Sequence, residues 1–269
     1  MRVVVGAAAL LFARILSGAE PGAIPSVSFG RHALDVVRTH IYTDRGTPAA
    51  KANLNSPGPN DFPPHLSIGL ETGKEADGQG RFVIFSTNYL RVYNIAEVKT
   101  APYKTIQPNL LNLERLLKGR PPRPPNFGKN GEDWKQEHEL PNYPPRNAGH
   151  LIEAKLSYID APWGSGVMYI TQFVQGLGET PNNEQLVCVF QGLSKKKQRF
   201  VAADFHITHP AVPATSAEPT FDWRKPGEQK AAEEFCDKIE RTLNSAADES
   251  FTPSLRSIRE WLVALKLDE

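Results

Sequence analysis

Ile152-Glu-Ala-Lys-Leu-Ser-Tyr158 is the stretch of sequence that decides the fold. Apolar and polar residues alternate along it, which is the period of a β-strand with one buried face. Residues 167–174 follow as an apolar run typical of a central strand, and residues 184–191 and 200–208 have strand composition as well. Because turn sequences join these four segments, we predict an antiparallel β-meander.

The carboxyl-terminal part of the chain has the period of helices. In a first segment, apolar residues recur every four positions, at Ala231, Phe235, Ile239 and Leu243. A second helix is predicted to begin at Thr252 as its capping residue, and its apolar residues share one stripe. Those residues are Leu255, Ile258, Leu262 and Leu265. Strands followed by helices predict an α+β fold, in which an antiparallel β-meander sheet has helices packed on one face and ends in a C-terminal helical pair.

Proline placement divides the earlier part of the chain, since proline is disfavoured inside helices and central strands. Residues 31–42 have helical spacing, and residues 81–96 have strand composition. Residues 109–118 carry a leucine stripe that ends before a glycine, which predicts a helix. The proline-rich residues 120–146 are expected to form a surface loop. We therefore predict a single α+β domain over residues 20–269.

The amino terminus has the three parts of a secretory signal peptide. A basic start at Arg2 precedes eleven small or apolar residues from Val3 to Ala13, and Ser17-Gly-Ala19 supplies a cleavage site. The run is too short for a transmembrane span, which needs about 20 apolar residues. We therefore expect residues 1–19 to be a signal peptide and the protein to be secreted or periplasmic. The alternative is a buried first strand or helix.

The composition excludes several classes of protein. Lysine and arginine number 31, aspartate and glutamate number 30, and the net charge is +1. Binding to nucleic acid or to anionic membranes depends mainly on excess positive charge, so neither is expected. With 40% hydrophobic and 23% charged residues, the chain is that of a folded domain rather than a disordered one.

The two cysteines, Cys188 and Cys236, admit two interpretations. In an exported protein a small, even number of cysteines is often paired, which predicts a disulfide between them. The alternative is two buried free thiols that act as small hydrophobic residues.

One cluster of residues with ligand chemistry falls in a predicted strand. Asp204 and His206 share the face that alternation leaves exposed, and His209 follows at the strand end. Carboxylate and imidazole together suit a metal such as zinc, or a general-base pair. A complete metal site needs a further ligand from elsewhere, for which His150 and His65 are the candidates. The alternative is that these residues line the solvent face of a strand.

The sequence contains none of the familiar enzyme motifs that we sought. It has no nucleophile elbow, phosphate-binding glycine loop, dinucleotide fingerprint or zinc-protease helix. Trp163, Tyr169 and Phe173 either line a sugar or peptide groove or belong to the core. The sequence favours a non-enzymatic binding or structural domain for an unknown protein or small-molecule ligand, with no cofactor. The alternative is a secreted hydrolase whose site assembles from residues distant in sequence.

Several short motifs in the predicted meander resemble a group of exported bacterial proteins of unknown function. The motifs are Asn147-Ala-Gly-His150, Tyr158-Ile-Asp160, Gly164-Ser-Gly-Val167, Tyr169-Ile-Thr-Gln-Phe-Val-Gln175, Phe190-Gln-Gly-Leu193 and Phe200-Val-Ala-Ala203. Many members of that group resemble lipoproteins, whereas this chain has no cysteine near the expected cleavage site. The resemblance implies an extracytoplasmic bacterial protein and assigns no catalytic residues.

Overall fold

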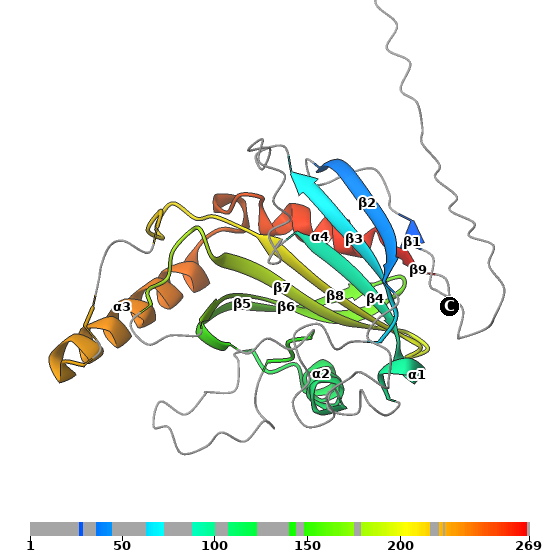
Figure 1. The fold of residues 1–269 in the computed structure, drawn as a ribbon, viewed down its shortest axis with the longest axis horizontal. Helices are drawn as coiled ribbons and strands as arrows, with labels where there is room; N and C mark the ends of the chain where they lie inside the picture. The colour runs from blue at the N-terminus through cyan, green and yellow to red at the C-terminus, as the bar shows by residue number, and fades with distance from the viewer. Residues whose placement is uncertain are drawn as a thin grey trace, which may run out of the picture.

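The computed structural model describes residues 27–28, 36–44, 63–72, 88–99, 107–122, 140–143, 148–174, 179–215, 221–222 and 224–267. The elements are β1 (Val27–Ser28), β2 (Val36–Asp44), β3 (His65–Thr72), β4 (Tyr89–Asn94), α1 (Ile95–Val98), α2 (Gln107–Gly119), β5 (Gly149–Ala161), β6 (Gly164–Val174), β7 (Leu186–Ser194), β8 (Arg199–His206), α3 (Pro226–Ser245), η3 (Asp248–Ser250), α4 (Leu255–Val263) and β9 (Lys266–Leu267) (Figure 1). The expected signal peptide and most of the proline-rich residues 120–146 lie outside the described residues. None of the described helices has the length and apolar character needed to cross a membrane.

Seven strands form one antiparallel sheet in the order β2-β3-β4-β8-β7-β6-β5, and β1 pairs separately with β9 (Figure 1). The predicted meander is confirmed, because β5, β6, β7 and β8 pair in succession. Strand β4 then pairs with β8 and places Val92 opposite Val201. The sheet and the carboxyl-terminal helices together confirm the predicted α+β class.

The amino-terminal strands differ from the sequence-based expectation. Residues 36–44 form strand β2, although the apolar spacing of residues 31–42 favoured a helix. Strand β2 pairs with β3 along its length, and its valine, threonine and isoleucine content suits that pairing. Within residues 81–96, the described part forms β4 and the short helix α1, and residues 81–87 lie outside the described residues.

One face of the sheet packs against α3 and α4 through apolar side chains. The strands contribute Leu66, Ile68, Leu90, Val92, Ile170, Phe190, Val201, Ala203 and Phe205, and the helices contribute Ile239, Leu243, Ile258, Trp261 and Leu262. Trp163 belongs to this core rather than to a groove, because it is buried and its indole Nε1 donates to the Leu262 carbonyl at 2.8 Å. Helix α4 is capped by Ser254, whose hydroxyl accepts from the Ser257 amide, and not by the predicted Thr252.

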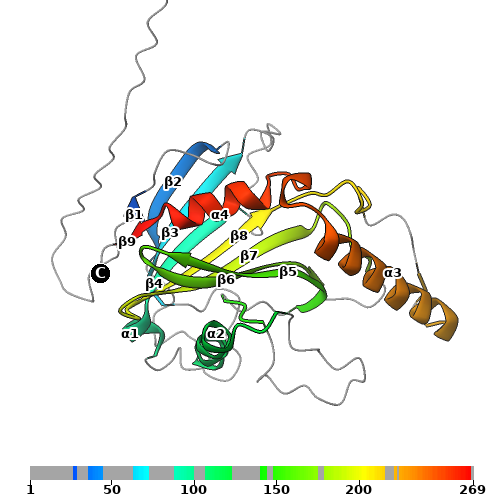
Figure 2. The same cartoon turned by 180° about the vertical axis from the view of Figure 1, so that it is seen from behind.

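The opposite face of the sheet packs against α2. Its contacts join Leu110 and Leu113 to Val167, Leu193 and Phe200, and Leu116 to Tyr169, Val187 and Val189. Helices therefore cover both faces, which corrects the prediction of helices on one face only; α4 and α2 lie on opposite sides of the strands in Figures 1 and 2. A leucine stripe shows that a helix packs against something, but it fits either face of a sheet equally well.

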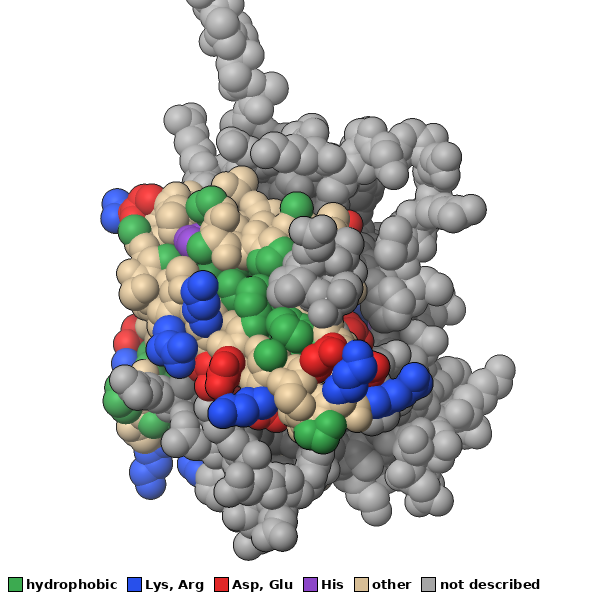
Figure 3. All heavy atoms as spheres, turned by 90° about the vertical axis from the view of Figure 1, so that its left-hand side faces the viewer, with side chains coloured by type: hydrophobic (Ala, Val, Ile, Leu, Met, Phe, Trp, Pro, Cys, Tyr) green, Lys and Arg blue, Asp and Glu red, His purple; other side chains and the backbone are tan. Residues whose placement is uncertain are grey.

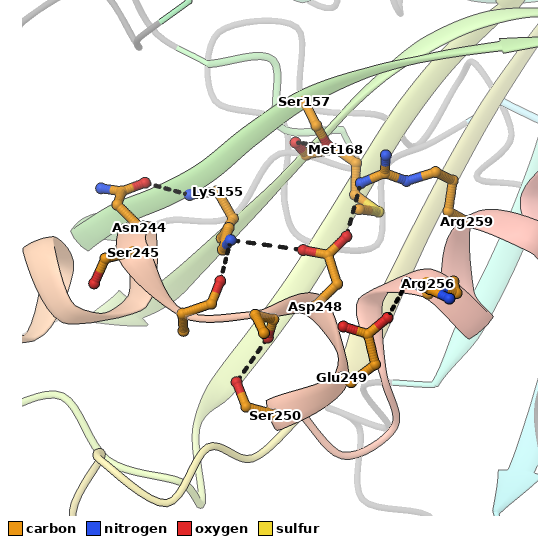
Figure 4. A network of polar contacts seen from close by, with 12 residues as sticks. Lys155, Ser157, Met168, Asn244, Ser245, Asp248, Glu249, Ser250, Arg256 and Arg259 are labelled. Carbon is orange, nitrogen blue, oxygen red and sulfur yellow. Dashed lines mark hydrogen bonds and ion pairs between the residues drawn. The ribbon is translucent and has the colours of Figure 1, made fainter.

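The edge strand β5 is distorted by two irregularities in its pairing with β6, one after His150 and one after Ala154. Lys155 lies within the second, with a φ of 55° in the left-handed region. Its ammonium group donates to the Ala246 carbonyl and lies 3.6 Å from Asp248, as Figure 4 shows. The bulge therefore turns this lysine toward the end of α3 and the turn that follows it.

Helix α3 covers the outer edge of β5. Glu240 Oε2 accepts a hydrogen bond from the Glu153 amide at 3.1 Å, and Asn244 Oδ1 accepts one from the Lys155 amide at 2.8 Å. The two acceptors are one helical turn apart, so they reach amides two residues apart on the strand. On an uncovered edge strand, such amides would be exposed to solvent. The carboxyl-terminal half of α3 makes these contacts, and its amino-terminal half extends beyond the sheet (Figure 1).

Two glycines leave room for a ring in the core. Gly166 on β6 and Gly192 on β7 are cross-strand partners, and the ring of Phe190 lies against both. A Cβ atom added at Gly166 would lie 2.3 Å from the Phe190 ring, a distance that close-packed carbon atoms do not tolerate. Gly164 and Gly166 both lie in β6.

Candidate functional site

Polar side chains interrupt the α2-facing side of the sheet where β4 meets β8. Asp204 on β8 is 2% exposed, and Tyr89 on β4 is its cross-strand partner. The Tyr89 hydroxyl donates to Asp204 Oδ2 at 2.9 Å, and the Arg91 guanidinium lies 4.4 Å from the centre of the Tyr89 ring. We call Tyr89, Arg91 and Asp204 the β4–β8 polar cluster. Burial of a carboxylate costs free energy unless it is hydrogen-bonded, so the cluster needs these partners.

Aromatic rings and small side chains border the polar cluster on the same face. His65 on β3 stacks on Tyr93 with ring centres 4.7 Å apart, and Tyr93 meets Tyr143 edge-on at 4.9 Å. Ser67 and Ala202 are the cross-strand neighbours of the cluster's arginine. The face therefore combines a cation, a carboxylate, a hydroxyl and ring surfaces around small residues, which is the composition of a site for a polar ligand.

The structure corrects the predicted environment of Asp204. Alternation placed it on a solvent face, but that face also packs against α2, and Asp204 is buried. His206 lies on the same face, as predicted, but its Nε2 is 2.8 Å from the Asn183 carbonyl and its backbone amide donates to Asn88 Oδ1. The two residues therefore share a face and bind different partners.

His209 is held in the turn beyond β8. Its Nδ1 accepts from the Ala211 amide at 3.2 Å, so its Nε2 carries the proton that is donated to Ser250 Oγ at 3.0 Å. The ring of Phe251 lies 4.7 Å away. Burial, with a smaller effect from Lys155, lowers the pKa of His209. These contacts give His209 a structural role between the sheet and the turn before α4.

The three predicted metal ligands do not converge on one point. Among the residues that the structure describes, no group of three or more histidine, cysteine, aspartate or glutamate side chains is arranged to hold a metal ion. His65, a candidate further ligand, bonds the Pro63 carbonyl through Nδ1 at 3.1 Å and stacks on Tyr93. His150, the other candidate, lies at the start of β5 and pairs with Glu153.

Both cysteines are free thiols, so the expected disulfide between Cys188 and Cys236 is not formed in the structure. Cys188 lies in β7 and Cys236 on α3, which covers the edge of β5. Strands β7 and β5 are separated by β6, and neighbouring strands are about 4.8 Å apart. Burial is the main cause that raises the pKa of both thiols, that of Cys236 to about 11.

Tyr89 and Arg91 were not predicted as site residues. Their alternation with Leu90 and Val92 places both on one face of a strand, which was the only local signal. That β4 pairs with β8 is a long-range feature that this alternation does not reveal. No family model, curated protein or solved structure matches the chain.

Proposed function

We propose that the protein is an exported binding domain that holds a small, hydroxyl-bearing anion at the β4–β8 polar cluster without chemical turnover. The observation that carries this proposal is the buried Asp204, hydrogen-bonded to Tyr89 beside Arg91. The same two strands are apolar on their other face, so the charges are not a general property of the strands. Buried charges that break a local rule are expected where a protein binds something. The leader-like residues 1–19 support the exported setting.

A sugar acid fits the chemistry of this cluster. The guanidinium of Arg91 binds a carboxylate through paired N–H groups, and its stacking on Tyr89 orients it in advance. Asp204 and the Tyr89 hydroxyl both accept hydrogen bonds from sugar hydroxyl groups. The small side chains of Ser67 and Ala202 flank the arginine on the neighbouring strands.

Isothermal titration calorimetry of the folded protein with glucuronate, and with glucose as its neutral counterpart, tests the proposal. We expect glucuronate to bind and glucose to bind at least about 10-fold more weakly, since a charge-assisted hydrogen bond contributes about 1.5–3 kcal/mol. Arg91→Gln should weaken glucuronate binding by a similar factor.

Arg256→Gln is the matched control, because Arg256 is exposed on α4 and pairs with Glu249 far from the cluster in sequence. This variant should bind glucuronate as the wild type does. Equal affinity of the wild type and Arg91→Gln for glucuronate contradicts the proposal, and so does the absence of binding to the wild type.

A further inference from the structure

The beginning of β5 carries a histidine–glutamate pair that the proposed binding site does not use. His150 Nδ1 lies 2.8 Å from Glu153 Oε1, and the two side chains are 14% and 13% exposed. Residues three apart on a regular strand point to opposite faces of the sheet. The shift in pairing between His150 and Glu153 removes this alternation and brings the two side chains together. The bulge therefore creates the pair.

The imidazole of His150 is held from several sides. The ring of Phe173 meets it edge-on at 5.2 Å, and the ring of Tyr169 lies 5.8 Å away. Glu153 is fixed in turn, because its backbone amide donates to Glu240 on α3. With Nδ1 directed to the carboxylate, no hydrogen bond from a described residue reaches Nε2 of His150. This nitrogen remains for a ligand.

The pair differs from the two histidines at and beyond the end of β8. His206 uses Nε2 to bond a backbone carbonyl, and His209 uses both ring nitrogens within the protein. An imidazole that has Nδ1 on a carboxylate and no hydrogen bond from a described residue at Nε2 has the arrangement of a general base. Strands β7 and β6 separate it from Asp204 on β8, the nearest residue of the β4–β8 polar cluster, so the two sites are independent.

The surroundings of the pair favour a neutral, apolar substrate. Figure 3 shows the side of the molecule from which α3 projects, where a patch of hydrophobic side chains has charged residues around it. The partly buried Phe173 supplies ring surface beside the imidazole, whereas the Tyr169 ring is fully buried. Within the described residues no lysine or arginine pairs with Glu153.

We propose that His150 and Glu153 form a hydrolytic site for neutral carboxylic esters that carry an aromatic or aliphatic group. His150 Nε2 takes a proton from a water molecule as the water oxygen attacks the ester carbonyl carbon. The tetrahedral intermediate then breaks its bond to the alcohol oxygen, and the departing alkoxide takes the proton from Nε2. Glu153 accepts the Nδ1–H bond and stabilises the imidazolium. The products are one carboxylic acid and one alcohol.

Hydrolysis of p-nitrophenyl butyrate by the whole protein tests the site. We expect His150→Gln to lower kcat about 100-fold or more with little change in KM, which is the usual contribution of a general base. Glu153 acts through His150 as a positioning residue, so Glu153→Gln should lower kcat and Glu153→Asp should restore part of it.

Glu234→Gln is the matched control, since Glu234 is an exposed residue of α3 that pairs with Lys230. It should hydrolyse the ester at the wild-type rate. Should His150→Gln fail to fold, the wild type is labelled with diethyl pyrocarbonate, and loss of activity should follow modification of His150 and reverse with hydroxylamine. An unchanged rate in folded His150→Gln overturns the proposal, and so does full activity after His150 is modified.

Discussion

The two faces of the sheet are made by the same strands and bury different chemistry. On β4, Leu90 and Val92 enter the core under α3 and α4, whereas Tyr89 and Arg91 lie on the side that α2 also covers. Asp204 on β8 is as deeply buried as the apolar residues that flank it. Because side chains alternate along a strand, one segment can serve stability on one face and binding on the other. The effects of substitutions on the free energy of unfolding should therefore differ between the two faces, both in size and in physical cause.

The largest effect is expected on the α4 side of the sheet. Trp261 is 3% exposed and meets Phe205 edge-on at 5.7 Å. Trp261→Ala removes this contact and leaves a cavity, which should lower the free energy of unfolding by about 3–5 kcal/mol. Urea denaturation measures it, with Leu111→Ala as the control, because Leu111 is 59% exposed and should change stability by less than about 0.5 kcal/mol. Equal stability of the two variants would show that α4 contributes nothing to the core.

A smaller effect on the same face comes from adding atoms rather than removing them. Gly166→Ala places a methyl group against the Phe190 ring and the Gln191 carbonyl, which should cost about 1–3 kcal/mol of stability. Gly149→Ala is the matched control, since no atom lies within 4 Å of a Cβ added there. Thermal unfolding of both variants measures the difference in stability. A Gly166→Ala protein as stable as the Gly149→Ala protein would contradict the close packing of Phe190 against Gly166.

On the polar face, loss of one hydrogen bond should cost less still. Tyr89→Phe keeps the ring under Arg91 and removes the hydroxyl that donates to Asp204, for an expected loss of about 1 kcal/mol. Leu90→Ala, one residue away on the apolar face, should cost about 2–5 kcal/mol. If Tyr89→Phe proves the more damaging of the two in urea denaturation, the polar face contributes to stability as much as the core does.

The fold could be predicted where its determinants are local. Alternation along β5 and the helical spacing of α3 lie within a few residues, so both elements could be predicted from the sequence. The side of the sheet that α2 covers, the pairing of β4 with β8 and the strand at residues 36–44 all depend on contacts between distant segments. Local periodicity carries no information about those contacts.

The same limit applies to the candidate sites. Asp204 could be predicted as a residue of interest from its own strand, but its partner Tyr89 comes from another segment, and its burial depends on what packs above it. The pair of His150 and Glu153 was hidden for the opposite reason, since a regular strand would separate them and only the bulge unites them. Irregular backbone is where a pattern-based prediction is least able to place side chains.

The smallest effect on stability that we expect comes from protonation of His209, which lies at the edge of the apolar core under α4. His209 packs on Phe251, which belongs to the core under α4, and burial followed by Lys155 lowers the pKa of this imidazole. The unfolded chain therefore binds a proton at His209 more readily than the folded protein does. The stabilisation by neutral His209 is complete above the ordinary histidine pKa of about 6.5. It is lost as the pH falls through that value toward the lower folded-state pKa. In His209→Gln the free energy of unfolding should be lower at pH 7.5, because the bonds to Ser250 and Ala211 are weakened, but it should fall less between pH 7.5 and pH 5.5. Urea denaturation of both proteins at the two pH values measures the free energy of unfolding. An identical fall of this free energy in the wild type and in His209→Gln would show that a charge on His209 is tolerated, as charges on the polar face are.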